Sequence, residues 1–262
     1  MKFARTRGAF RRFYIAELGL PDRSECARDA RVMYRLAVAD SYCDAGVAAD
    51  VVFFPTMAQA VPGVSGWGAD VAQDQHGRPI ILMMGWKVPP TAKGRADAEL
   101  TGEDRKVVLH ELLHGLGFSI QKLKDAGGGV SNVARGALGM KETLGLATLR
   151  PVVDLDGTRD DVWHTTGPRT MEVARGFFNC SEAWFDALPM MGLNPLGPGS
   201  RGSHFETRLL ADELMSYGGG AVVSPFTLSF LEDLGFYLAD YSAVRAVLYP
   251  TPPELLHAAP SS

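Results

Sequence analysis

This chain has few cysteines, a small net charge and no long apolar run. Three cysteines, Cys26, Cys43 and Cys180, occur in 262 residues, so at most one intramolecular disulfide can form and one thiol is left over. The net charge of −4 gives no electrostatic footprint for a nucleic acid. No apolar run reaches the roughly eighteen residues of a membrane-spanning helix. These absences disfavour a disulfide scaffold, a basic nucleic-acid-binding protein and a transmembrane protein, and the 46% of hydrophobic residues fits a globular enzyme.

One segment, residues 107–118, carries the pattern H-E-x-x-H followed by a glycine, Gly117. A helix turns once per about 3.6 residues, so His110 and His114 lie on one face and can hold one metal ion. Glu111 lies about 100° further round the helix and can reach a metal-bound water without being a ligand. The motif therefore predicts a zinc site in which Glu111 is the general base.

Two histidines one turn apart are otherwise often a satisfied pair in a core or on a surface. Apart from the motif residues and Gly115, all positions in residues 107–116 are apolar, so we expect this helix to be buried almost all round. Unpaired polar groups are costly in such a place, and a zinc ion accounts for two buried histidines beside a glutamate.

A catalytic zinc keeps three protein ligands and leaves its fourth position to water. Thermolysin-like sites take a glutamate from a downstream helix, but Gly117 lets the chain leave the helix and bring a later histidine to the metal. Of the downstream histidines, His257 lies in a proline-rich tail and His164 in an expected strand. His204 follows a flexible glycine-rich approach and precedes Met215, as in the Met-turn that underlies such sites. The predicted ligands are therefore His110, His114 and His204.

Further segments accompany this motif: residues 49–54, 73–80, 172–175, 178–180, 202–208, 212–215 and 231–237. Together they resemble the leishmanolysin-like metallopeptidases, metzincins in which a long insertion separates the helix glycine from the third histidine. The resemblance covers about residues 45–242, and its specific features are the order of the segments and the step from His204 to Met215.

The resemblance implies an α+β, metzincin-like zincin fold. A mixed, twisted sheet with helices would form an N-terminal lobe to about residue 118, an irregular and helical C-terminal lobe would follow, and the active-site cleft would lie between them. It also implies one Zn2+ per chain and a metalloendopeptidase that hydrolyses a peptide or protein, bound in extended conformation, with a zinc-bound water activated by Glu111. Met215 is expected beneath the metal without ligating it.

The sequence leaves alternatives open for the hydrogen-bond partners of the ligands and for the role of Tyr217. Each zinc-bound imidazole should donate its other N–H to a carbonyl or a carboxylate, and Glu206, Asp212 and Glu213 are the acids near His204. Tyr217 follows Met215 as in the turns of astacins and serralysins. It is therefore either a weak extra ligand or hydrogen-bond donor at the metal, or an aromatic residue that packs against the turn.

The chain departs from the family in its cysteine content. Leishmanolysins resemble disulfide-rich secreted proteins with a propeptide, a Cys-rich region and often a lipid anchor, whereas this chain is cysteine-poor. It is either a trimmed relative from a reducing compartment or a truncated gene product. The resemblance implies a secreted or cell-surface location, while the low cysteine content and the interrupted apolar run at the N-terminus also allow an intracellular one.

Two rival functions remain open at the level of the sequence. One is a non-catalytic, zinc-stabilised module for cell adhesion or scaffolding derived from a peptidase, and the other is a zinc hydrolase with a non-peptide substrate. The presence of Glu111 favours catalysis, because a structural site needs ligands but no general base.

The rest of the chain organises around this site. We expect a basic arm at residues 1–22, a catalytic domain at 23–242 and a proline-rich tail at 243–262. Apolar spacing predicts helices at 26–41 and 170–178, and a third helix from a Ser224 cap to Gly235 with Leu228, Leu231 and Leu234 on its packed face. Short apolar runs predict strands at 51–54, 66–73 and 80–86, and residues 75–77 form the turn of a hairpin. The resemblance to metzincins implies that a strand of this hairpin borders the cleft and could pair with an extended substrate.

Overall fold

The structure is a computed structural model that describes residues 2–3, 49–57, 65–86, 101–126, 131–136, 139–153, 157, 159–192, 201–218 and 220–244. The helix expected at 26–41, most of the basic arm and most of the proline-rich tail lie outside the described residues. The helices are α4 (Gly102–Gly115), α5 (Ile120–Asp125), α6 (Pro168–Phe178), α7 (Pro225–Asp233) and the 3-10 turn η3 (Tyr241–Ala243). The strands are β1 (Lys2–Phe3), β2 (Val52–Met57), β3 (Gly66–Gln73), β4 (Pro79–Trp86), β5 (Ser131–Gly136), β6 (Gly139–Leu144), β7 (Ala147–Val153), β8 (Arg159–Thr165), β9 (Leu188–Pro189) and β10 (Tyr237–Leu238).

The N-terminal sheet has the order β2-β4-β3 and is mixed, as expected from the family resemblance. Strand β4 pairs in parallel with β2 and antiparallel with β3. It is buried from Pro79 to Gly85, as suits a central strand with a continuous apolar sequence. The predicted hairpin is confirmed, and its turn is closed by the Asp74 side chain, which accepts hydrogen bonds from the N–H groups of His76 and Arg78.

Helix α4 lies against this sheet at glycines. A Cβ placed on Gly68 of β3 would lie 1.9 Å from the backbone oxygen of Glu111, and one on Gly66 would lie 3.0 Å from the Glu111 Cγ atom. On the helix side, a Cβ on Gly115 would lie 3.3 Å from Leu82. The absence of side chains at Gly66 and Gly68 therefore lets β3 approach the helix turn that carries Glu111.

Gly68→Ala is expected to destabilise the fold, because its methyl group would overlap backbone that cannot move aside. Overpacking of this kind costs about 1–3 kcal/mol or more. Denaturant unfolding measures the loss, and Gly102→Ala is the matched control because nothing lies within 4 Å of its Cβ position. Equal stability of the two variants would contradict the close approach of β3 and α4.

The C-terminal half contains an antiparallel sheet of order β5-β6-β7-β8-β9. The expectation of an irregular and helical C-terminal lobe was therefore wrong. Strands β7 and β8 carry Arg150, Pro151, Asp160 and Asp161, which interrupt the apolar alternation by which a strand is recognised in a sequence. These strands are stabilised by backbone hydrogen bonds to their neighbours, which the side-chain pattern of a single strand does not predict.

Helices α6 and α7 confirm the two remaining helix predictions. Ser224 caps α7 by accepting a hydrogen bond from the Phe226 N–H at 3.1 Å. The Asp233 carboxylate at the end of α7 accepts from the N–H groups of Arg169 and Thr170, both at 2.9 Å, and so caps the start of α6. Of the expected packed face, Leu231 and Leu234 are buried and Leu228 is partly buried.

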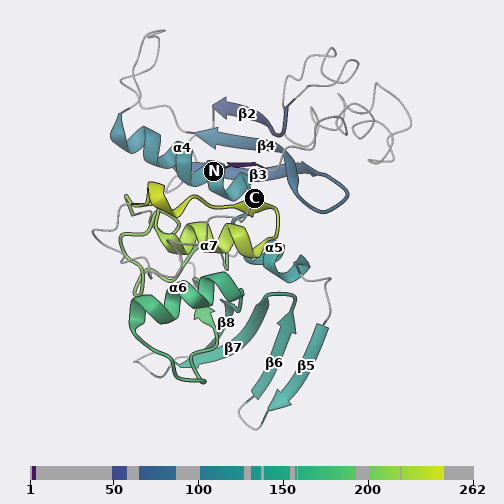
Figure 1. The fold of residues 1–262 in the computed structure, drawn as a ribbon, viewed down its shortest axis with the longest axis vertical. Helices are drawn as coiled ribbons and strands as arrows, with labels where there is room; N and C mark the ends of the chain where they lie inside the picture. The colour runs from purple at the N-terminus through teal and green to yellow at the C-terminus, as the bar shows by residue number, and fades with distance from the viewer. Residues whose placement is uncertain are drawn as a thin grey trace.

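Helix α7 lies between the two sheets (Figure 1). The β2-β4-β3 sheet and α4 form one end of the molecule, and α6 with β5 to β8 forms the other. The Phe118 ring, fully buried just after α4, stacks on Phe230 of α7 with 4.1 Å between centroids, and the Phe205 ring meets it edge-on at 5.1 Å. The aromatic core thus joins the end of α4 to the segment that contains His204.

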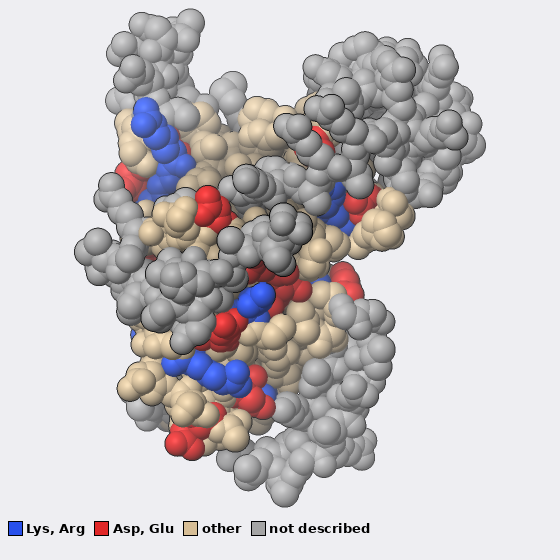
Figure 2. Space-filling model, viewed as in Figure 1, with Lys and Arg blue, Asp and Glu red and all other residues tan. Residues whose placement is uncertain are grey.

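Charged side chains of both signs alternate on the face of the molecule in Figure 2. Ion pairs among the described residues include Arg201–Asp160 and Arg150–Asp186, each at 2.7 Å. Among the described residues, no helix combines the length and the apolar character required to cross a lipid bilayer.

Candidate metal centre

Helix α4 is defined at both ends by its own sequence. At the start, Thr101 and Asp104 form a capping box in which each side chain binds the other residue's backbone N–H. At the end, the Gly117 N–H donates to the His114 carbonyl and the Phe118 N–H to the Leu113 carbonyl. This is a Schellman turn, and it needs the φ of +106° that Gly117 adopts. The chain leaves helix α4 at Gly117, as predicted.

The helix is not buried almost all round, as the sequence suggested. Leu109 is 39% exposed, and Val107, Val108 and Leu112 are only partly buried. The side toward β3 and β4 is covered, whereas the opposite side borders the site. The apolar residues of the motif therefore do not all belong to the core.

His204 reaches the helix because three neighbouring segments hold its backbone. The Gly202 carbonyl accepts from the Ile120 N–H at 2.9 Å, and the His204 carbonyl accepts from the Met191 N–H at 2.9 Å. The Phe205 N–H donates to the Met215 carbonyl at 2.9 Å. The third histidine is thus fixed both to the chain that follows α4 and to the turn at Met215.

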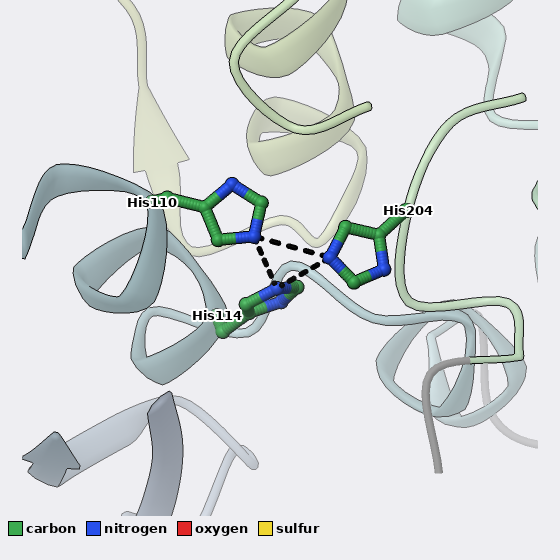
Figure 3. A group of neighbouring side chains, drawn as sticks. All are labelled: His110, His114 and His204. Atoms are coloured by element: carbon green, nitrogen blue, oxygen red, sulfur yellow. Dashed lines mark hydrogen bonds between the residues drawn. The ribbon is translucent and has the colours of Figure 1, made fainter. Parts of the chain in front are cut away.

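The three predicted ligands point their Nε2 atoms toward one point (Figure 3). The Nε2 atoms of His110 and His204 and those of His110 and His114 are 3.1 Å apart, and those of His114 and His204 are 3.3 Å apart. Zinc about 2.0–2.1 Å from each nitrogen in tetrahedral geometry would separate the nitrogens by about 3.3 Å. The donor set and its dimensions therefore fit a zinc ion bound by three imidazoles.

The imidazoles are disposed to be neutral, which is the form that binds a metal. Burial lowers the pKa of His110, and it lowers that of His114 well below its usual value, with the neighbouring His204 and His110 adding to the effect. Neutral rings also avoid repulsion among three groups this close together.

Each ring is oriented through its Nδ1 atom. His110 donates to the Leu214 carbonyl at 2.7 Å and His114 to the Phe118 carbonyl at 2.9 Å, while Nδ1 of His204 lies 3.0 Å from the Ser203 hydroxyl. These partners were not identified from the sequence. Two are backbone carbonyls, which any residue type supplies, and the serine is simply the neighbour of its histidine.

The acids considered as partners of His204 have other contacts. Glu206 pairs with Arg208, and Glu213 is fully buried with hydrogen bonds to Ser224 and Thr227. Asp212 is exposed.

Glu111 lies on the buried side of α4, at 7% exposure. Burial alone raises the pKa of its carboxyl group to about 7, close to the value that suits a general base at neutral pH. A cation held by the histidines would lower this pKa again by favouring the carboxylate.

Met215 and Tyr217 flank the site on the side of His204. Met215 is fully buried, and the Tyr217 ring meets the His204 ring edge-on with 5.7 Å between centroids. The Thr207 hydroxyl fixes the Tyr217 backbone by donating to its carbonyl at 2.9 Å. The ring contact is compatible with both roles considered for Tyr217.

The remaining described histidines lie elsewhere. His164 is buried in β8, where its Nδ1 donates to the Val162 carbonyl at 3.0 Å, and His76 is exposed in the β3–β4 turn. His257 and the glycine run after residue 126 lie outside the described residues. Cys180 is a free thiol, whereas Cys26 and Cys43 also fall outside them.

Comparison with known proteins gives a consistent result. A sequence model of one family, described as leishmanolysin, matches residues 26–251. The leishmanolysin homolog of Crithidia fasciculata is 28% identical over 195 residues, which are 74% of this chain and 25% of that protein. Leishmanolysin of Leishmania major is 26% identical over 199 residues, 76% of this chain and 28% of the relative. The leishmanolysin-like peptidase of Drosophila melanogaster is 30% identical over 160 residues, 52% of this chain and 22% of the relative. The chain thus spans about a quarter of the length of the curated relatives it matches.

Proposed function

We propose that this chain, which belongs to the leishmanolysin family, is a zinc-dependent endopeptidase whose site is formed by His110, His114, His204 and Glu111. The observation that supports this most directly is the convergence of three Nε2 atoms within 3.1–3.3 Å beside a buried glutamate. The relatives add support, because leishmanolysin of Leishmania major and the leishmanolysin-like peptidase of Drosophila melanogaster align with this chain at 26% and 30% identity. We assign the catalytic domain to residues 23–242.

His110, His114 and His204 would hold the zinc ion through their Nε2 atoms. Bound there, zinc would lower the pKa of a water molecule toward neutrality and polarise the substrate carbonyl. The three Nδ1 hydrogen bonds fix the ring planes, so each Nε2 lone pair is directed at the common point without further adjustment.

Glu111 would carry the proton through the reaction. Its carboxylate accepts a proton from the attacking water, and the resulting carboxylic acid donates that proton to the amine that leaves. Burial raises the pKa of Glu111, and a cation bound by the histidines would lower it again by favouring the carboxylate, which is the form that accepts the proton. Water attacks directly, so no covalent intermediate with the protein forms.

An extended peptide could bind along β3. Among the described strands β3 pairs only with β4, so its other edge offers free backbone donors and acceptors. The same strand contacts α4 at Glu111 through Gly66 and Gly68. A peptide added to this edge would therefore run beside the catalytic base, which supports a peptide over a small amide as substrate.

The alternative of a non-catalytic adhesion or scaffold module has less support. Such a module needs the histidines but not Glu111, and the relatives described above are named as leishmanolysins or as a leishmanolysin-like peptidase. The presence of a buried glutamate next to His110 in the sequence favours catalysis.

Peptidase activity is tested directly with the purified chain and an unfolded protein substrate. We expect internal cleavage that stops when a chelator removes the metal and returns when zinc is added. Hydrolysis of small amides without cleavage of the protein would instead support the zinc hydrolase of other specificity, and zinc binding without any hydrolysis would support the structural module.

Tyr217→Phe is expected to lower kcat roughly ten- to a thousandfold with little change in KM or zinc affinity. The reason is that the phenol, beside His204, would donate a hydrogen bond to the carbonyl oxygen only as negative charge develops on it. Steady-state kinetics of the two proteins measure the effect. If kcat is unchanged, the ring serves only to pack against the Met215 turn.

A further inference from the structure

Glu213 is a buried acid that the proposed mechanism does not use. It is fully buried, and burial raises the pKa of its carboxyl group to about 7. Within the part of the chain that the structure describes, no lysine, arginine or histidine side chain forms an ion pair with it. Its only compensation there is hydrogen bonding, so the contacts of this carboxylate decide what it does.

Both carboxylate oxygens accept from nearby donors. Oε1 accepts from the Thr227 hydroxyl and from the backbone N–H of Met215, the latter at 3.3 Å, and Oε2 accepts from the Ser224 hydroxyl. The Ser224 oxygen is itself occupied by the Phe226 N–H, which leaves its proton to Glu213. Thr227 and Ser224 belong to the start of α7, whereas Met215 follows the residue whose carbonyl binds His110.

The Met215 N–H and the Leu214 carbonyl are the two ends of one peptide group. The N–H end donates to Glu213, and the carbonyl end accepts from Nδ1 of His110 at 2.7 Å. Hydrogen bonds on either side of a peptide group polarise each other, so a negative charge at the N–H end makes the carbonyl a stronger acceptor. A continuous chain therefore runs from the Glu213 carboxylate through one peptide group to His110.

We propose that Glu213 is a positioning residue for the metal site that acts on His110 through the Leu214–Met215 peptide. In many zinc sites a carboxylate binds the ligand histidine directly and increases its basicity. Here the peptide group lies between the two, so the carboxylate holds and polarises the acceptor rather than touching the ring. The proposal rests on the proposed zinc site, and it adds a residue that affects metal affinity without being a ligand.

The same contacts would also allow a purely structural role, in which Glu213 only anchors the start of α7. Asp233 provides the comparison, because it is also a buried carboxylate that accepts from the start of a helix. Its hydrogen bonds run to Arg169 and Thr170 of α6 and include no residue of the metal site. Replacement of either acid by its amide places an NH2 group against backbone or hydroxyl donors, so both variants lose stability for the same physical reason.

The experiment compares Glu213→Gln with Asp233→Asn in the full chain. Thermal unfolding of the metal-free proteins measures stability, and competition with a chromogenic chelator at a temperature where both are folded measures zinc affinity. We expect both variants to unfold at lower temperature, but only Glu213→Gln to bind zinc about 10- to 100-fold more weakly than the parent chain. If Glu213→Gln binds zinc as tightly as Asp233→Asn does, the positioning role is wrong.

Two further outcomes are distinguished by the same measurements. If Glu213→Gln does not fold, Thr227→Val removes one donor to the carboxylate while keeping the side chain's shape. It should then weaken zinc binding by a smaller factor, and unchanged affinity in that variant would overturn the proposal. Failure of the parent chain itself to bind zinc would contradict the proposed function rather than the role of Glu213.

Discussion

Glu111→Gln is expected to keep zinc bound while kcat falls by about 10²- to 10⁴-fold. The amide preserves the shape of the side chain in its position against Gly66, but it cannot accept a proton from water. The three Nε2 atoms are unchanged by the substitution, so the metal-binding constant should remain close to that of the parent chain.

Metal content by elemental analysis and initial rates on a peptide substrate test this prediction together. A variant that cleaves at nearly the parent rate would show that another group accepts the proton. A variant that loses both metal and activity would show instead that Glu111 contributes to holding the site, and the kinetic result alone could not separate these roles.

His204→Ala is expected to weaken zinc binding by about 3–5 kcal/mol, roughly 10²- to 10⁴-fold. The substitution removes one of three protein ligands, and with it about a third of the usual free energy of zinc binding. His110 and His114 would remain on α4 as a two-ligand site. Activity should be lost at zinc concentrations that saturate the parent chain.

His164→Ala is the control, since His164 is buried in β8 and bonds to the Val162 carbonyl away from the three ligands. It should lower stability and leave the zinc affinity of the folded protein unchanged. Full zinc occupancy in the His204 variant at limiting metal concentration would refute the assignment of the third ligand.

The sequence predicted the grouping of the three histidines better than it predicted the fold around them. Spacing alone places His110 and His114 on one face, and the methionine that follows His204 singled out the third histidine from among three. The capping box of Thr101 and Asp104 matches an S/T-x-x-D/E pattern before an apolar run, so the start of α4 could also have been predicted from the sequence.

Other features could not be predicted for physical reasons. The partners of His110 and His114 are backbone carbonyls, which leave no trace in residue type. Strands β7 and β8 of the C-terminal sheet pair with each other, but their sequences contain charged residues and proline. They therefore lack the alternation of apolar and polar residues from which a strand is predicted. The exposure of Leu109 depends on which side of α4 the sheet covers, and this is a property of the assembled fold.

The two parts of the metal site must meet late in the folding of this chain. The rings of His110 and His204 are 94 residues apart in sequence, and the carbonyl bound by His110 follows it by 104 residues. Contacts of this separation form slowly, because the entropy of closing the intervening loop is lost before the contact is gained. Helix α4, with its own cap and terminal turn, can form locally much earlier. A partly folded chain would therefore display two histidines and a glutamate on a helix without the third histidine, so the proposed activity would require that its long-range contacts have closed.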